Sequence, residues 1–391
     1  MTELTTEAKL NTLPTQEMLF DVSSLMSYLH HITDPRHARG VRYPLVTVLV
    51  LLILAKLGGE DGMKGISEWV KLRGSQLVNL LHLSHASMPH QTTYERVLDA
   101  LDVQEVEQVI GAFFAQEQAP NLTISIDGKV LRGTIPVGAT QGTHLLAAYV
   151  PEQGVVLMQI EVASKANEIA AAPRLLASIN LTHCVVTGDA MFTQHDLCVQ
   201  IVAAGGDFVL PVKANQKTLQ HAIADLFMPA DVAKAHQPIA LPEAFIHTTA
   251  NGHGRIEKRY LTVSSQLNDY LDFPHIQQVF RLQRVVHHQK TGKISYQVVF
   301  GITSLAAKDC PPQRLMTLIR QHWLIENRLH YVRDVTFHED ACRIRVTKRQ
   351  RLLAAINNLV IGLIRHCDFD YVPEARRFFS LNYDKALQLL L

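Results

Sequence analysis

The stretch Leu122-Thr-Ile-Ser-Ile-Asp127-Gly-Lys-Val-Leu-Arg-Gly133 is where the fold of this 391-residue chain can first be read. Apolar and polar residues alternate from Leu122 to Ile126, as in a strand with one buried face. The β-branched residues favour the same structure. The strand leads to Asp127 in an Asp-Gly pair, and the cations Lys129 and Arg132 follow. This arrangement suits a metal ion and a phosphate group. A simple hairpin turn is the alternative.

Length and composition bound the class of protein. A chain of 391 residues exceeds one ordinary hydrophobic core, so we expect about two or three domains. A hydrophobic fraction of 47% with 19% charged residues is typical of a folded soluble protein. The net charge of +1 does not by itself indicate a nucleic-acid partner. A basic cluster between Arg343 and Arg351 is a candidate phosphate-contacting stripe, with a solvated helix face as the alternative.

Cysteine usage and the N-terminus indicate the compartment. The five cysteines are scattered, without a C-x-x-C pair, which favours a reducing compartment and argues against a zinc site. The first residues, 1–7, lack the basic start and apolar core of a signal peptide. The most apolar run, 45–55, spans about eleven residues, whereas a membrane span needs roughly twenty. We therefore expect a cytoplasmic protein without membrane contact.

Residues 1–118 are predicted to be helical. An apolar helix follows Pro44 and ends at Gly58-Gly59, and Thr92-Thr-Tyr-Glu95 is a capping-box pattern that opens another helix. Short helices around 90–96 also fit a variant of the DNA-reading helix-turn-helix. A plain helical packing domain is the alternative, so DNA binding by this region stays open.

From residue 119 the pattern changes to strands alternating with helices. The order of three strands, helix, strand, helix, strand predicts a mixed sheet covered by helices. One short apolar strand, 184–189, ends in the carboxylate of Asp189, as the first strand ends in Asp127. Residues 217–295 break this rhythm and are predicted to form an inserted β-rich module. There Arg255 shares a strand face with its neighbours, either as a surface ionic row or as a DNA contact.

Residues 311–335 are predicted to form one long helix, and its register selects a third carboxylate. At about 100° per residue, His322, Glu326 and Arg333 fall in the apolar stripe of this helix. An unpaired carboxylate in such a stripe costs several kcal/mol. Glu326 is therefore expected either to pair with Arg333 or to face a metal ion shared with other acids. Asp334 projects elsewhere and is the weaker choice.

Two aspartates at neighbouring strand ends and a glutamate on a packing helix are ligands that Mg²⁺ or Mn²⁺ prefers. Two such ions about 4 Å apart can activate a water or a 3′-hydroxyl and stabilise the leaving oxygen during displacement at phosphorus. We expect two ions, held by Asp127, Asp189 and Glu326, and no other cofactor. Basic residues expected to hold the phosphate backbone nearby are Lys129, Arg132, Lys165 and Lys213.

Seven short motifs occur in one order along the chain. They are Asp34-Pro-Arg-His-Ala-Arg-Gly40-Val-Arg-Tyr-Pro44, Ile126-Asp-Gly-Lys-Val-Leu-Arg-Gly133, Lys165-Ala-Asn-Glu-Ile169, Thr187-Gly-Asp-Ala-Met-Phe-Thr-Gln194, Val212-Lys-Ala-Asn-Gln216, His253-Gly-Arg-Ile-Glu257 and His322-Trp-Leu-Ile-Glu-Asn-Arg-Leu-His330. Together, over residues 20–365, they resemble the H-repeat-associated (ISAs-type) branch of the bacterial DDE insertion-sequence transposases.

The resemblance implies an α/β fold, namely an RNase H-like mixed sheet with flanking helices, preceded by an all-helical N-terminal domain and interrupted by a β-rich insertion. The implied domains are 1–118, helical; 119–216, first part of the catalytic core; 217–295, insertion; 296–350, second part of the core with the Glu helix; and 351–391, C-terminal helices. The implied DDE triad maps onto Asp127, Asp189 and Glu326.

The implied activity is metal-dependent cleavage of insertion-sequence ends, followed by transfer of the freed 3′-hydroxyl ends into target DNA. The implied partners are double-stranded DNA, as terminal repeats and target, and a second copy of the chain in a homodimer or larger assembly on DNA. A catalytically lapsed DNA-binding derivative and a host-adapted nuclease remain the alternatives. Further expected DNA contacts within the motifs are Asn215, Gln216, Arg255, His322, Asn327 and Arg333.

Overall fold

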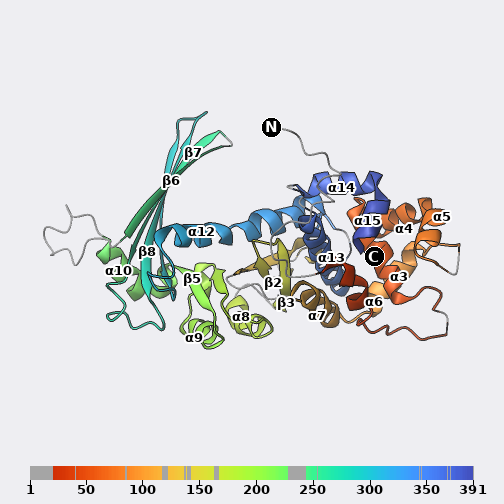
Figure 1. Ribbon diagram of the computed structural model, residues 1–391, viewed down its shortest axis with the longest axis horizontal. Coiled ribbons are helices and arrows are strands. Elements are labelled where there is room, and N and C mark those ends of the chain that lie inside the picture. Colours follow the sequence, from red (N-terminus) through yellow and green to blue (C-terminus); the bar gives the residue numbers. More distant parts are fainter. Residues whose placement is uncertain are drawn as a thin grey trace. The chain divides into compact units, whose positions relative to one another are not determined.

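The computed structural model divides the chain into two compact units. Unit 1 consists of Met1–Ala119, Gly128–Glu168 and Ile325–Leu391, and unit 2 of Pro120–Asp127 and Ile169–Leu324. Figure 1 shows the elements of both units along the chain. The residues that the structure describes are 21–39, 41–83, 86–116, 122–135, 138, 142–162, 167–227, 244–252, 254–342, 344, 346–367, 369 and 371–390.

Unit 1 is mainly helical. Its N-terminal helices are η1 (Val22–Ser24), α2 (Leu25–Leu29), α3 (Leu45–Leu57), α4 (Met63–Leu72), α5 (Gly74–Leu80), α6 (Gln91–Ala100) and α7 (Val103–Phe114). Its later helices are η2 (Arg132–Thr134), the π-helical turns η6 (Ile325–His330) and η7 (Val332–Thr336), α13 (Thr347–His366), α14 (Val372–Leu381) and α15 (Tyr383–Leu390). The predicted helical character of the N-terminal region is confirmed.

The apolar helix α3 begins after Pro44 and is followed by Gly58, as its sequence predicts. A Cβ at Gly58 would lie 2.6 Å from the indole nitrogen of Trp69, so this helix end has no room for a side chain. The predicted capping box at α6 is wrong in detail. His90 rather than Thr92 is the N-cap residue, and its imidazole accepts a hydrogen bond from the backbone N–H of Thr92. None of the helices that the structure describes combines the length and hydropathy needed to cross a membrane.

The strands form a mixed sheet in which β1 (Thr123–Leu131) belongs to both units. In unit 1 the strand order is β3-β2-β1, with β2 (Thr143–Val150) and β3 (Val155–Val162) as the predicted antiparallel hairpin. In unit 2 the order is β1-β4-β5-β9-β8-β7-β6. The strands of unit 2 are β4 (Val185–Gly188), β5 (Asp207–Val212), β6 (Ala244–Gly252), β7 (Arg255–Ser264), β8 (Gln278–His288) and β9 (Ile294–Thr303).

The direction of the strands changes within unit 2. Strands β1, β4 and β5 run parallel, whereas β5 pairs with β9 in the antiparallel sense, as do the remaining neighbours out to β6. The mixed α/β fold class is thus confirmed. The helices of this unit are α8 (Glu168–Leu176, except its first residue), η4 (Ala190–Phe192), α9 (His195–Ala203), η5 (Ala214–Gln216), α10 (Lys217–Leu226) and α12 (Pro312–His322).

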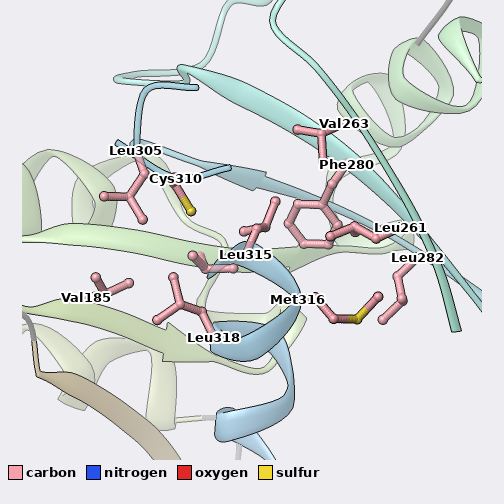
Figure 2. Packing of buried hydrophobic residues seen from close by; sticks show 11 residues of the cluster. Val185, Leu261, Val263, Phe280, Leu282, Leu305, Cys310, Leu315, Met316 and Leu318 are labelled. Atoms are coloured by element: carbon pink, nitrogen blue, oxygen red, sulfur yellow. The ribbon is translucent and has the colours of Figure 1, made fainter. Parts of the chain in front are cut away.

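Helix α12 is the core helix of unit 2. Figure 2 shows Leu315, Met316 and Leu318 of this helix packed among buried side chains of the sheet, including Phe280 and Leu282. Fully burying a side chain of this kind stabilises a fold by about 1.5–3 kcal/mol. α12 therefore covers the part of one sheet face that carries Leu261, Val263, Phe280 and Leu282.

The predicted single helix over 311–335 is wrong. The α-helix ends at His322 and is followed by the π-helical turns η6 and η7. A π-helical turn has i→i+5 hydrogen bonds and holds more residues than an α-helical turn. The residues beyond His322 are therefore rotated relative to a uniform 100° register, and the predicted stripe does not extend through Glu326.

Candidate functional site

The aspartates Asp127 and Asp189 lie one step beyond paired positions of two adjacent parallel strands. In the register of β1 and β4, Ile126 pairs with Gly188. Asp127 and Asp189 are the next residues, so they lie on neighbouring strands at the same level. Asp189 directly follows the end of β4, but β1 continues past Asp127 to Leu131, so the predicted strand end at Asp127 is wrong. The side chain of Asp189 is 52% exposed, and that of Asp127 is half-buried. Such carboxylates at one edge of unit 2 can both reach a ligand in solvent.

The absence of a side chain at Gly188 allows the end of β4 to pack closely against its neighbours. A Cβ at Gly188 would lie 3.0 Å from Ile126 and 3.0 Å from the ring of Phe192. These distances are tighter than ordinary van der Waals contact, so a larger residue would push β4 and the following Asp189 away from β1. The glycine before the second aspartate therefore has a packing role that the sequence alone did not reveal.

His322, at the C-terminal end of α12, lies beside the second aspartate. Its Nε2 is 3.8 Å from Asp189 Oδ1, and its Nδ1 is 3.3 Å from Thr187 Oγ1. Thr187 in turn lies 3.0 Å from the hydroxyl of Ser125 on β1. The imidazole is only 12% exposed. A buried hydroxyl chain thus orients His322 next to Asp189.

Glu326 is exposed, which contradicts its expected place inside an apolar stripe. Its side chain is 57% exposed, whereas that of His330, four residues later, is 5% exposed. His330 Nδ1 lies 3.2 Å from Glu326 Oε2. Both residues belong to a group of side chains that could hold a metal ion. The sequence analysis missed His330, although its spacing from Glu326 carried the signal.

Arg333 is not the partner of Glu326, so the expected pairing is wrong. Its side chain is fully buried and pairs with Glu339 at 2.8 Å, with further hydrogen bonds to Gln159 and Asn358. Burial alone would raise the pKa of Glu339, but the charge and hydrogen bonds of Arg333, together with Lys129 and Asn357, outweigh burial and hold the pKa below its ordinary value. A fully buried guanidinium cannot reach DNA, so Arg333 is structural rather than a DNA contact.

Lys129 also pairs with carboxylates of the protein itself. Its ammonium group donates to Asp334 and lies 4.0 Å from Asp340, and only 7% of its side chain is exposed. Burial raises the pKa of Asp340, and the nearby Asp334 raises it further while Lys129 opposes both. Arg132 lies 3.5 Å from Asp340 but remains 72% exposed. Of these two predicted phosphate contacts, only Arg132 is open to solvent.

Two side-chain amides of the segment after β5 form hydrogen bonds with the loop that follows Asp189. The side-chain amide of Asn215 donates to the carbonyl of Ala190, and that of Gln216 donates to the carbonyl of Thr193. Lys213 is exposed on the same segment. The two amides therefore act on the loop conformation, and Lys213 is the residue available to an external ligand.

The remaining predicted DNA contacts are scattered. Arg255 is half-buried at the start of β7, near the buried Glu257, which accepts from Arg284 and pairs with Arg259 at 2.7 Å. This favours the ionic-row alternative for that strand face. Asn327 is exposed on η6. Lys165 lies outside the described residues, as does His253.

The basic cluster at 343–351 is not a phosphate-contacting stripe where the structure describes it. Arg349 pairs with Asp99 at 2.6 Å, and Arg351 pairs with Glu107 at 2.9 Å and Glu161 at 2.6 Å. Lys348 donates to the carbonyl of Ala100. Positions 343 and 345 lie outside the described residues. These cations tie α13 to α6, α7 and β3 within unit 1.

A buried carboxylate that the sequence analysis missed lies against Gly128 in unit 1. Glu168 is 3% exposed, and a Cβ at Gly128 would lie 2.4 Å from its carboxylate. His144 Nδ1 is 3.8 Å from Glu168 Oε1. Gly128 directly follows Asp127 inside β1, so the glycine of the Asp-Gly pair makes room for this carboxylate and does not form a turn.

The donor groups suit a hard divalent ion. In unit 2, neighbouring positions of β1 and the end of β4 present carboxylates, and in unit 1 the exposed carboxylate of Glu326 lies beside an imidazole. Carboxylate oxygens, with water and phosphate oxygens, are the ligands that Mg²⁺ and Mn²⁺ take. All five cysteines are free, and four of them are buried. The donor chemistry therefore fits the expected ions.

Comparison with known families gives two matches that together span most of the chain. The family described as Transposase DDE domain matches residues 119–363, and the one described as DDE_Tnp_1-associated matches residues 26–114. The boundary between the two matches falls where the sequence changes from helices to strands.

Two relatives from Escherichia coli are similar over most of their length. The protein named "Putative transposase YncI" is 30% identical over 358 residues, covering 88% of each chain. The one named "H repeat-associated putative transposase YhhI" is 26% identical over 355 residues, covering 88% of this chain and 91% of its own. A solved piggyBac transposase synaptic complex with hairpin DNA covers 98% of this chain and 80% of its own, with a TM-score of 0.42 and 11% identity. A likeness that distant carries no weight for fold or function.

Proposed function

The chain belongs to the H-repeat-associated family of DDE transposases, and on this premise we propose that it cleaves DNA at insertion-sequence ends and joins the freed 3′-hydroxyl ends to target DNA. The observation that carries the proposal is the parallel register of β1 and β4, in which the residues after Ile126 and Gly188 are both aspartates. Relatives at about 30% identity support the transposase family, and the cleavage and joining steps are our inference.

We further propose that the catalytic sheet is RNase H-like. Its support is the strand order β3-β2-β1-β4-β5, with an antiparallel hairpin first and parallel strands after it. Strands β6 to β8 then form the greater part of an insertion between the second aspartate and Glu326. The predicted domain boundaries remain part of this proposal.

The proposed metal ligands are Asp127, Asp189 and Glu326. Within unit 1, Glu326 lies beside the imidazole of His330, and both side chains offer a ligand atom. Two bound Mg²⁺ or Mn²⁺ ions would supply an activated oxygen nucleophile and stabilise the leaving oxygen at phosphorus. The two aspartates are held by the β1–β4 pairing, and Glu326 is supplied from the π-helical turn.

Neighbouring residues would orient these carboxylates. His322, held by Thr187, restricts the rotation of Asp189, and His330 restricts that of Glu326. Such supporting hydrogen bonds commonly change metal affinity or activity by about 10–100-fold when removed. The amides of Asn215 and Gln216 keep the loop after Asp189 in place.

DNA is the proposed partner, and the exposed cations are its proposed contacts. Arg132 and Lys213 are exposed, and Lys165, Arg255, His322 and Asn327 remain candidates. Because transposition joins two element ends, we expect at least a homodimer on DNA. This function implies the cytoplasm, where bacterial DNA lies.

The decisive experiment supplies purified protein with Mg²⁺, duplexes carrying the DNA that flanks its coding sequence, and a supercoiled target plasmid. Cleaved and joined products support the proposal. Cleavage without joining indicates a nuclease, and retarded DNA without new ends indicates a lapsed derivative. Asp127→Asn and Asp189→Asn should each abolish cleavage and leave DNA binding largely intact. Retained cleavage in either variant would remove that residue from the site.

A further inference from the structure

The antiparallel strands β6 to β9 have a second face that α12 does not cover. In an antiparallel ladder, directly paired residues lie on the same face, and alternate residues lie on opposite faces. Leu261 and Leu282 pair with each other and belong to the core under α12. Their neighbours Tyr260 and Gln283 form the next pair and therefore lie on the opposite face. We call this opposite face the aromatic face.

The aromatic face carries large side chains that are open to solvent. Phe245 on β6 is 56% exposed and Tyr296 on β9 is 70% exposed. Phe245, His247 and Tyr260 form a stacked group, with ring centroids 6.2–6.4 Å apart and interplanar angles of 22–26°. Several exposed aromatic side chains gathered on one sheet face are typical of a binding surface.

The charge of the aromatic face has one sign. Lys258 and Arg281 lie on it, and none of its paired positions from the row of Phe245 to the row of Asn251 is an aspartate or glutamate. The acidic Glu257 lies on the opposite face with Arg259 and Arg284. The surface is thus complementary to an anionic partner that also has flat apolar groups.

From these observations we propose that the aromatic face binds single-stranded DNA, with unpaired bases stacking on its exposed rings. Aromatic rings set among a few cations on an open sheet are typical of surfaces that bind unpaired nucleic acid. A duplex keeps its bases stacked internally and presents phosphates, which would call for a denser set of cations than Lys258 and Arg281 provide. A second copy of this face is disfavoured, because a symmetric contact would oppose like charges.

This inference rests on the proposed function for the identity of the nucleic acid. Cleavage at an element end leaves strands that can fray or separate from the duplex, and the aromatic face would hold one of them. The binding surface includes no proposed metal ligand, so single-strand binding and catalysis can be tested separately.

The test measures fluorescence anisotropy of the full chain with a labelled (dT)15 oligonucleotide and with its duplex, in EDTA. Phe245→Ala and Tyr296→Ala should each weaken single-strand binding about fivefold or more, from the loss of stacking, and change duplex binding less than about twofold. Tyr296→Phe keeps the ring and should bind like the wild type. The control is Tyr270→Ala, because Tyr270 is 76% exposed in unit 2 but outside these strands; its affinity should not change.

Photocrosslinking with 5-iodouracil in the oligonucleotide gives a second measurement, and adducts on β6, β7 or β9 are expected. The proposal is overturned by unchanged single-strand affinity in both alanine variants, by equal losses for single strand and duplex, by an equal loss in Tyr270→Ala, or by adducts confined to other elements. Asp127→Asn should retain single-strand binding. A wild-type chain that binds the oligonucleotide through this face but never cleaves DNA would contradict the proposed function and leave this inference standing.

Discussion

Glu326 and Glu339 lie on one short segment of unit 1, but their environments are opposite. Glu326 is 57% exposed beside the buried His330, whereas Glu339 is 10% exposed beside the fully buried Arg333. A buried charge is tolerated only when a partner neutralises it and hydrogen bonds satisfy its oxygens. Glu339 therefore maintains the fold, and Glu326 is the carboxylate that can accept a ligand from solution.

The largest expected effect follows from removing the exposed carboxylate. Glu326→Gln keeps the size of the side chain but removes a charged metal ligand, so DNA cleavage should fall by a factor on the order of 10³ or more. The Tm should change little, because the side chain lies mainly in solvent. A cleavage assay and a thermal melt on the same preparation test this, and a Glu326→Gln protein that cleaves normally would reverse the two roles.

Glu339→Gln should give the converse result. It leaves the buried Arg333 charge uncompensated, which typically costs about 3–5 kcal/mol of the free energy of unfolding. Urea denaturation of this variant beside Glu326→Gln measures the difference. The double variant Arg333→Met with Glu339→Leu should recover much of the loss, because it removes both buried charges. Wild-type stability in Glu339→Gln alone would contradict this assignment.

A smaller effect is expected at His330. Replacing it by Gln should weaken Mn²⁺ binding about tenfold, because Glu326 loses the imidazole that orients it. Isothermal titration calorimetry measures this without turnover. His338→Gln is the control, since His338 is 70% exposed and lies 3.4 Å from Asp61. Equal Mn²⁺ affinity in the wild type and His330→Gln would exclude an orienting role.

The two glutamates should also differ in how stability depends on pH. The pKa of Glu339 lies below its ordinary value, because burial raises it less than the charge and hydrogen bonds of Arg333, with Lys129 and Asn357, together lower it. As the pH falls, the unfolded state therefore takes up a proton at a higher pH than the folded state does. The stabilisation by ionised Glu339 is fully present above the unfolded pKa of about 4.3 and is lost as the pH falls through the folded pKa. Urea midpoints from pH 6 to pH 3 should fall more steeply for the wild type than for Glu339→Gln. The same dependence of the urea midpoint on pH in both proteins would contradict the lowered pKa of Glu339.

The smallest effect separates exposed cations from paired ones. Lys213→Ala should lower the slope of log K against log salt for DNA binding by about one unit if this side chain neutralises a phosphate. Arg349→Ala should leave the slope unchanged, because Arg349 is 14% exposed and bound to Asp99. Filter-binding titrations over a range of salt concentrations measure both slopes. A lower slope for Arg349→Ala and an unchanged slope for Lys213→Ala would show that Arg349, and not Lys213, contacts phosphate.

The strands beside the two aspartates were predictable, because the signals are local. Alternation up to Ile126 and the apolar run before Asp189 each identify a strand without knowledge of other parts of the chain. The end before Asp189 is as predicted, whereas β1 continues past Asp127 to Leu131. The pairing of Ile126 with Gly188 then follows from the parallel arrangement that alternating strands and helices favour. The apolar helix α3 was predictable for the same reason.

The surroundings of Glu326 were not predictable in this way. A uniform helical period fails once the backbone changes to π-helical turns after His322, and that change has no clear residue signature. The basic residues at 343–351 were misread because their partners, such as Asp99 and Glu161, are distant in the sequence. Charge counts along a chain do not tell which cations are already neutralised.

The sequence by itself determined that this chain has a helical N-terminal region and a mixed sheet with an aspartate on one strand and another directly after a second strand, because hydrophobic periodicity and turn residues act over a few positions. Only the tertiary structure decided which charges are buried in pairs, which carboxylate faces solvent, and which sheet face α12 leaves uncovered. Those properties depend on burial and on partners brought together from distant parts of the chain, and both arise only when the chain packs.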